Sequence, residues 1–215
     1  MKRIAAGFLA GLFCAILSTA ASAADPYDRY ERGRGGPPPP PRGAGAPPPT
    51  HAVYGQPYFF LHGGFFEPNS DAPTTTGGGL GGYDTGSSLD FGIGSRVSPN
   101  LAIEGAVGRF AAERGSDDAR VVPLTFGVRL ILPHPVIEPY AGAGLGMYFA
   151  HLNEPGIDDS DTTVGGYASI GVDAWLNPRV ALNFEGKYHF VEPEFRGINV
   201  DMSGWTVSMG VRVSF

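Results

Sequence analysis

Histidines are the first side chains to test for chemistry, because an imidazole can act as a base or bind a metal ion. The chain contains His51, His62, His134, His151 and His189. Their spacing matches no metal-ligand pattern. A base also needs a nucleophile, which a serine two residues further along a strand would supply. Val191 takes that place after His189, and neither His62 nor His151 has a serine at this spacing. We therefore expect no enzyme, no cofactor and no metal site.

Charged side chains also lie inside segments that are apolar at every second position. In residues 120–132, Leu124, Phe126 and Val128 alternate with a second set that contains Arg129. The charged members of such second sets are Asp90, Arg96, Glu104, Arg129, Asp173, Glu185, Lys187 and Arg212. Four are acidic and four are basic, so we expect them to pair in one enclosed network, since an unpaired buried charge is costly. This network would either plug the interior or exchange partners as a gated path.

A period of two continues through the chain from Tyr58 onward, without a run of about 18 apolar residues that would indicate a membrane-spanning helix. Alternate residues of a strand face opposite sides, so each segment is predicted to be a strand with one apolar face. Strands are expected at residues 58–66, 88–97, 101–112, 120–132, 137–150, 165–176, 180–191 and 204–215. They are longer than the five or six residues usual in soluble sheets, which is typical of strands that cross a membrane.

The connections between these strands are predicted to alternate in length. Tight turns are expected at 98–100, 133–135 and 177–179, and longer polar loops at 67–87, 113–119, 151–164 and 192–203. Outer-membrane barrels have short periplasmic turns and longer outer loops, and a bilayer excludes open sheet edges. The sequence therefore predicts an all-β fold, an eight-stranded antiparallel up-and-down transmembrane β-barrel, with both termini in the periplasm.

Composition divides the chain into three parts. Lys2 and Arg3 precede an apolar run that ends near a small-residue cleavage pattern, so residues 1–23 are predicted to be an export signal peptide. Residues 24–57 are rich in Pro and Gly and are expected to form a disordered linker. Residues 58–215 are expected to form the barrel domain. With 15 Lys and Arg against 21 Asp and Glu, the acidic balance excludes nucleic acid as a partner.

Three segments carry a family resemblance. The ending WTVSMGVRVSF (205–215) resembles the C-terminal signal of bacterial outer-membrane proteins, with a terminal aromatic residue and apolar residues at every second position. PYAGAGLGMY (139–148) and LNFEGKYHF (182–190) are similar to strands of the small eight-stranded outer-membrane barrels. That family includes the OmpA transmembrane domain, OmpX, OmpW and the opacity-like surface proteins. The resemblance covers about residues 58–215.

The resemblance implies export to the bacterial outer membrane, with its lipids and lipopolysaccharide as neighbours. It also implies that the barrel-assembly machinery recognises the strand ending in Phe215. Two functions remain open. One is a structural or surface-interaction role, in envelope integrity, adhesion or contact with an extracellular or host ligand through acidic outer loops. The other is a small channel, as suggested for OmpW-like relatives that move apolar solutes. The charged interior favours the first, because paired charges offer no apolar passage.

Two further motifs have simpler interpretations. The interior glycines lack the strand–loop–helix context of a phosphate loop; they are Gly92, Gly94, Gly142, Gly144 and Gly146. They are expected to bend the backbone or to leave room for Arg and Tyr side chains. The acidic residues of segment 154–161 lack the order of a calcium-binding EF-hand. They predict a solvated outer loop, with a weak divalent contact that bridges lipopolysaccharide as the alternative.

Overall fold

The computed structural model describes residues 55–69, 80–115, 117–154, 157–195 and 197–215. The predicted signal peptide and nearly all of the predicted linker lie outside these residues. The strands are β1 (Pro57–Pro68), β2 (Gly86–Ser98), β3 (Leu101–Arg114), β4 (Asp117–Ile131), β5 (Ile137–Glu154), β6 (Ile157–Asn177), β7 (Val180–Phe190), β8 (Glu194–Phe195), β9 (Ile198–Asn199) and β10 (Gly204–Ser214). Within the described ranges, no helix is both long enough and apolar enough to cross a membrane.

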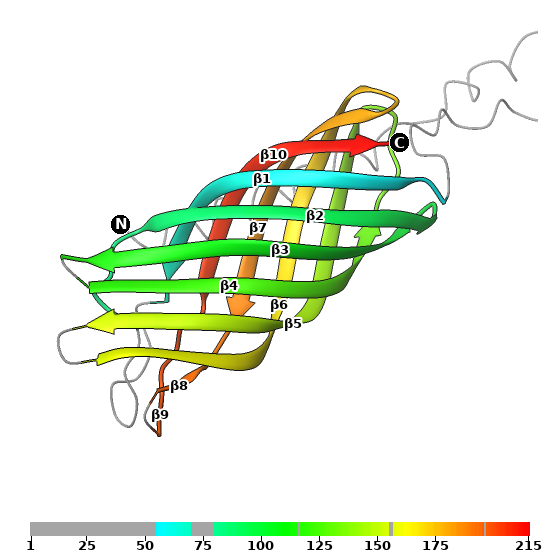
Figure 1. The fold of residues 1–215 in the computed structure, drawn as a ribbon. Coiled ribbons are helices and arrows are strands. Elements are labelled where there is room, and N and C mark those ends of the chain that lie inside the picture. The colour runs from blue at the N-terminus through cyan, green and yellow to red at the C-terminus, as the bar shows by residue number, and fades with distance from the viewer. Residues whose placement is uncertain (1–54, 70–79, 116, 155–156, 196) are drawn as a thin grey trace, which may run out of the picture. The chain divides into compact units, whose positions relative to one another are not determined.

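The long strands close into a single barrel. Their order around it is β1-β10-β7-β6-β5-β4-β3-β2, with antiparallel neighbours throughout. The first and last strands pair from Tyr58↔Ser214 to Pro68↔Gly204, so cyan β1 lies beside red β10 in Figure 1. Closure gives every barrel strand a hydrogen-bonded neighbour on both sides. The predicted eight-stranded antiparallel barrel is confirmed.

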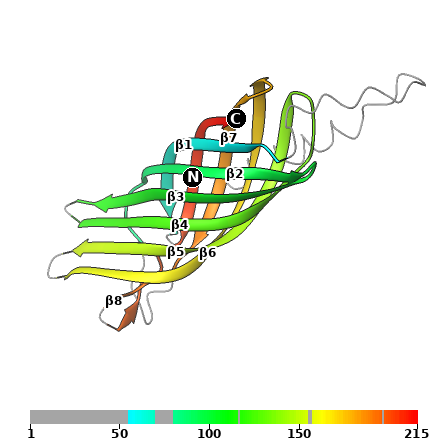
Figure 2. The ribbon, with the colours of Figure 1, turned by 45° about the vertical axis from the view of Figure 1, so that its right-hand side comes forward.

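The two ends of the barrel differ. We call the end with the connections around residues 99–100, 132–136 and 178–179 the turn end, and the opposite one the loop end. Pro57 and Phe215 meet at the turn end, where the Phe215 amide donates to the Pro57 carbonyl oxygen at 3.1 Å. At the loop end, β8 and β9 form a small separate sheet inside the last connection. Strands β3 to β6 extend furthest in this direction (Figures 1 and 2).

The prediction of long loops at 113–119 and 151–164 was wrong. Strands β3 and β4 pair as far as Arg114↔Asp117, and β5 and β6 pair as far as Glu154↔Ile157. The apolar alternation used to predict strands ends where the sheet leaves the membrane. Hydrogen bonds between the two main chains do not need that alternation, so the polar hairpins continue beyond it.

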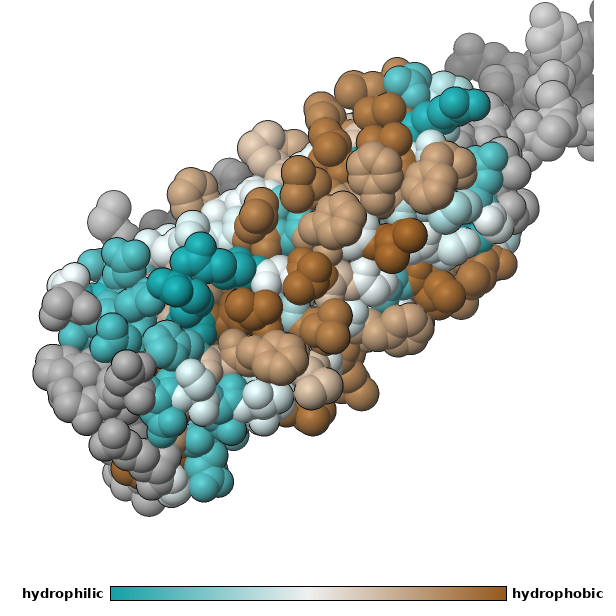
Figure 3. Space-filling view, viewed as in Figure 1, coloured by the Kyte–Doolittle hydropathy of each residue, from teal (hydrophilic) through white to brown (hydrophobic). Residues whose placement is uncertain are grey.

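Outward-facing residues form an apolar belt around the barrel. Phe91, Ile93, Leu124, Phe126 and Leu145 are each more than half exposed. In Figure 3 apolar residues, in brown, cover the middle of the visible face, and hydrophilic side chains gather toward the loop end. A belt of this kind faces lipid, because so large an exposed apolar area is unstable in water.

The interior divides into two layers along the barrel. Nearest the loop end, Phe66, Phe110, Tyr148, Val191 and Met202 belong to one buried apolar cluster. Nearer the turn end, the buried side chains are mostly charged and aromatic. The sequence predicted only a charged network in the interior, so that prediction was incomplete. The apolar layer arises because the strands keep their two-residue period after they leave the membrane, with aromatic and aliphatic residues inward.

Candidate functional site: the charged barrel interior

The structure places all the charged residues of the predicted network inside the barrel. Asp90 and Arg96 come from β2, Glu104 from β3 and Arg129 from β4. Asp173 comes from β6, Glu185 and Lys187 from β7, and Arg212 from β10. The relative exposure of these side chains is at most 14%. Because successive side chains of a strand point to opposite faces, each of these residues faces inward, opposite the lipid-facing belt.

Four of these residues join across the interior in a closed circuit, which we call the Arg–carboxylate ring: Glu104, Arg129, Asp173 and Arg212. Arg129 lies 3.0 Å from Glu104 and 3.5 Å from Asp173 between charged atoms. Arg212 lies 3.2 Å from Glu104 and 3.3 Å from Asp173. Each carboxylate therefore faces two guanidinium groups. This arrangement offsets the cost of removing the four charges from water.

Two tyrosines that the sequence analysis did not select support the ring. The guanidinium of Arg129 lies 3.7 Å from the centre of the Tyr140 ring, and that of Arg212 lies 4.4 Å from the centre of the Tyr58 ring. The Tyr58 hydroxyl donates to Glu104 at 2.6 Å, and the Tyr140 hydroxyl donates to Glu185 at 3.1 Å. Cations over aromatic faces are attracted by the ring quadrupole. Each tyrosine thus contacts an arginine through its ring face. Its hydroxyl donates to a carboxylate that pairs with the same arginine.

Asn183 on β7 is a second partner that the sequence analysis missed. Its side-chain amide donates to Asp173 at 2.6 Å and to the Tyr140 hydroxyl at 2.9 Å. Asn183 stands two residues before Glu185, so strand alternation alone would have placed it inside the barrel. The predicted network was selected by charge, so its neutral hydrogen-bonding side chains were left out.

Lys187 forms a branch of the network toward the loop end. Its ammonium lies 2.8 Å from Asp90 and 3.0 Å from Glu185. Glu185 also lies 3.7 Å from Arg129, which connects this branch to the ring. Ion pairs thus connect Asp90, Glu185 and Lys187 with the ring.

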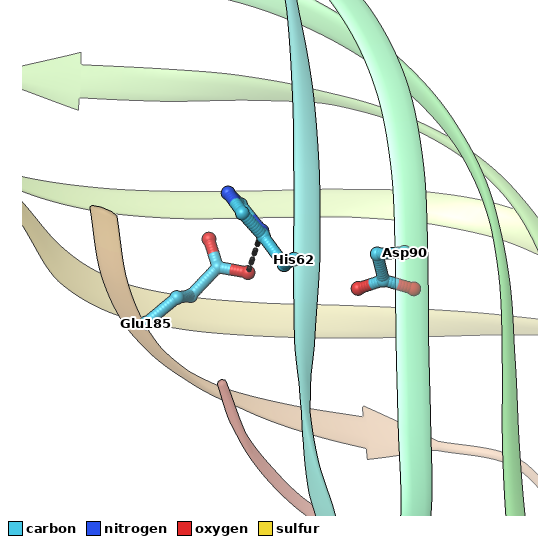
Figure 4. A group of neighbouring side chains, drawn as sticks. All are labelled: His62, Asp90 and Glu185. Carbon is cyan, nitrogen blue, oxygen red and sulfur yellow. Dashed lines mark ion pairs between the residues drawn. The ribbon is translucent and has the colours of Figure 1, made fainter. Parts of the chain in front are cut away.

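His62 on β1 borders the same branch and gives the interior a candidate metal-ligand group. Ligand atoms of His62, Asp90 and Glu185 lie within 4.8 Å of one another. Figure 4 shows the Glu185 carboxylate turned toward the His62 ring, at 3.9 Å from Nδ1. The Lys187 ammonium already contacts both carboxylates, so a cation of the protein itself balances this group. A metal ion would have to displace it, and we assign none.

Arg96 does not join the network and was wrongly grouped with it. It forms a two-pronged pair with Glu138 near the turn end, with hydrogen bonds of 3.2 and 3.0 Å. The Trp175 indole also donates to Glu138 at 2.9 Å. The sequence analysis omitted Glu138, so its balance of acids and bases was incomplete. This acid faces inward on the same side of β5 as Tyr140, which is the signal that would have identified it.

The interior glycines make room for the aromatic side chains, as one of the two interpretations expected. A Cβ atom on Gly94 would lie 2.6 Å from the Tyr58 ring, and one on Gly144 would lie 2.6 Å from the Tyr167 ring. Both distances are far below van der Waals contact. The glycines therefore permit tyrosines to lie across a narrow barrel.

Small cavities lie among the interior side chains. One, of about 20 Å³, lies near the turn end between Tyr58, Glu138 and Arg212. Another, of about 10 Å³, lies between Glu104, Arg129 and Lys187. Each has room for about one water molecule. Solutes larger than water do not fit into these spaces.

Outside the barrel, the structure brings together a histidine and a serine that the spacing test had separated. The His151 Nδ1 and Ser160 Oγ atoms lie 3.0 Å apart across β5 and β6. A spacing within one strand cannot detect a pair formed by residues on neighbouring strands.

Asp161 of the acidic segment accepts a hydrogen bond from the Glu194 amide at 2.8 Å. Its neighbours Asp159 and Ser160 also lie on β6, so the predicted acidic loop is largely strand.

Solved structures of other proteins share this fold. Neisserial surface protein A is 20% identical over 74% of this chain and 97% of its own, with a TM-score of 0.60. OprG from Pseudomonas aeruginosa is 15% identical over 77% and 98%, with a TM-score of 0.54. Ail, the attachment invasion locus protein of Yersinia pestis, is 13% identical over 76% and 100%, with a TM-score of 0.50. At these identities the likeness concerns the fold. No curated protein matches the sequence.

The sequence itself identifies the family. Residues 44–215 match the family described as outer membrane protein beta-barrel domain. The match includes every strand of the closed barrel and its apolar belt. This chain therefore belongs to the outer membrane β-barrel protein family, and its place is the bacterial outer membrane.

Proposed function

We propose that the protein is a sealed barrel with a structural or surface-interaction role, rather than an open pore. The observation that carries this proposal is the Arg–carboxylate ring. It connects β3, β4, β6 and β10 across the interior. Arg129, one of its four members, is only 1% exposed. A path through the barrel would have to separate these ion pairs, which are costly to break inside a protein.

The apolar layer supplies a second barrier. The rings of Phe66 and Phe110 pack 4.4 Å apart, and Tyr148 and Met202 are fully buried beside them. A solute that entered from the loop end would therefore meet close-packed side chains before it reached the charged layer. The water-sized cavities lie below this packing and do not offer a passage for solutes.

We place the loop end outside the cell and both ends of the barrel chain in the periplasm, in accord with the usual threading of outer-membrane barrels. In this orientation the extended hairpins β3–β4 and β5–β6 project from the surface. They and the last connection would carry the contact with an extracellular or host ligand. Surface and attachment proteins occur among the barrels of similar fold, which is compatible with this role but does not carry it.

A small channel is the second candidate. The branch around Lys187 favours it, because the ammonium has two carboxylate partners and Arg129 has three. Groups with several partners can exchange them with little loss, so the network could open stepwise. In this alternative the interior charges would act as a gate.

Release of small solutes from proteoliposomes separates the two functions. Purified full-length protein is reconstituted into phosphatidylcholine vesicles loaded with a small sugar and, separately, with a small apolar dye. The sealed barrel should release neither faster than protein-free vesicles. Release that grows with the amount of folded protein would reject the proposal and favour the channel.

A further inference from the structure

Two exposed arginines lie close together on the outer face of the barrel. They are Arg109 on β3 and Arg120 on β4. His151 on β5 stands directly opposite Arg120. Ala111, two residues beyond Arg109, pairs with Arg120, so the two arginines are diagonal neighbours on one face.

These residues lie where the apolar belt ends. Arg109 stands opposite Leu89 and two residues beyond Val107, which are 56% and 45% exposed. His151 likewise follows Phe149, a belt residue that is 43% exposed. Strongly hydrophilic side chains border the brown belt over β3 and β4 in Figure 3. A guanidinium at this level extends from hydrocarbon into the headgroup layer.

The two arginines can take an external partner. The structure gives Arg109 no ion-pair or hydrogen-bond partner among the described residues. Arg120 contacts Asp118 at 2.8 Å, but both side chains are open to solvent, at 45% and 24%. An exposed pair of this kind contributes little. An arginine fork binds a phosphate through two parallel hydrogen bonds, and such bonds are stronger away from bulk water.

We propose that Arg109 and Arg120, with His151 beside them, form a binding site for the phosphate groups of a glycolipid in the outer leaflet. The lipid's acyl chains would lie along the belt below, over Leu89, Val107 and Phe149. Glu113 and Asp118 pair one step further out on the same face, and a lipid phosphate would replace Asp118 as the partner of Arg120. The site lies on the outer face, so it does not depend on whether the interior conducts.

Native mass spectrometry of the full-length protein in detergent micelles tests the site. The probe is purified lipid A with its two phosphates, compared with the same lipid after removal of both. The wild type should retain the phosphorylated lipid much better than the dephosphorylated one. Replacement of both arginines (Arg109→Gln with Arg120→Gln) should weaken retention of the phosphorylated lipid by about tenfold or more, since each lost ionic hydrogen bond is worth about a factor of ten.

Arg179→Gln is the matched control, because Arg179 is also exposed but lies in the β6–β7 turn at the opposite end. It should leave retention unchanged. Equal retention by the wild type and the double variant, or an equal loss with Arg179→Gln, would overturn the site. Inorganic phosphate at millimolar concentration should not release the lipid. Release would assign the site to free anions and would overturn the glycolipid as its ligand. The single variants, each expected to show a partial loss, give the same test if the double variant does not fold.

Discussion

The Arg129 guanidinium lies 3.7 Å from the centre of the Tyr140 ring, inside a barrel whose outer face is apolar. The same guanidinium contacts Glu104 and Asp173 on other strands. The hydrogen bonds of the sheet join strands only around the circumference of the barrel. Arg129 therefore adds a connection across the interior. Ion pairs of the interior brace the barrel across its centre, and in the proposed function the same contacts close it to solutes.

Removal of Arg129 should weaken the barrel strongly. In Arg129→Ala, Glu104 and Asp173 each keep only Arg212 as their arginine partner in the ring, and buried carboxylates lose a counter-charge. We expect the free energy of unfolding to fall by about 3 kcal/mol, at the lower end for broken buried pairs because water can enter the adjacent cavity. Urea titration in micelles, followed by tryptophan fluorescence, measures it. Arg179→Ala in the exposed turn is the control, with a change below about 0.5 kcal/mol.

Tyr140→Phe removes the hydroxyl and keeps the aromatic ring, so it measures the contribution of the hydroxyl alone. The aromatic face under Arg129 remains, but the bonds to Glu185 and from Asn183 are lost. We expect a loss of about 1–2 kcal/mol in the same titration, as for other buried polar groups left without a partner. Tyr140→Ala should cost more, because the cation also loses its aromatic face. If both substitutions had the same effect, the ring would not support Arg129.

His62→Phe should be tolerated, although His62 is buried beside the network. Neither ring nitrogen has a hydrogen-bond partner among the described residues, and the ring stacks on Phe60 at 4.9 Å. A phenyl ring keeps the stacking and removes two unsatisfied polar atoms, so the unfolding free energy should change by less than about 1 kcal/mol. A loss as large as that of Arg129→Ala would show that His62 holds the network together.

The barrel could be predicted from the sequence because lipid imposes a simple pattern. Each strand that crosses the membrane must be apolar on alternate residues, as 122–132 and 205–215 are. Beyond the membrane this requirement ends, and the pattern no longer marks the strands. The extensions of β5 to Glu154 and of β6 back to Ile157 were missed for that reason.

The site was predictable in its members but not in its pairings. Alternation places Arg129 and Glu104 on the inner face, yet it cannot say that Arg96 turns to Glu138 instead. Which inward side chains meet depends on the stagger between distant strands, and no local pattern encodes that stagger. Tyr58, Tyr140 and Asn183 were missed because a search for charge does not detect neutral partners.

Phe215 should be required for assembly. It follows β10, its amide bonds to Pro57, and its ring lies 6.1 Å from Phe59 on the neighbouring strand. Deletion of Phe215 should lower the amount of folded protein in the outer membrane, since the terminal strand would lose the residue that the assembly machinery is expected to recognise. Unboiled samples on a denaturing gel, where folded barrels migrate faster, measure the yield. Phe215→Tyr should preserve it, and unchanged yield after deletion would contradict the prediction.

Single-channel current across planar lipid bilayers tests the sealed interior most directly. Wild-type protein should show at most rare and small openings, because the Arg–carboxylate ring and the apolar layer close the barrel. Arg129→Ala should open more often, since the ring loses its central side chain, while Arg179→Ala should behave as the wild type. A large and steady wild-type current that Arg129→Ala leaves unchanged would contradict the account.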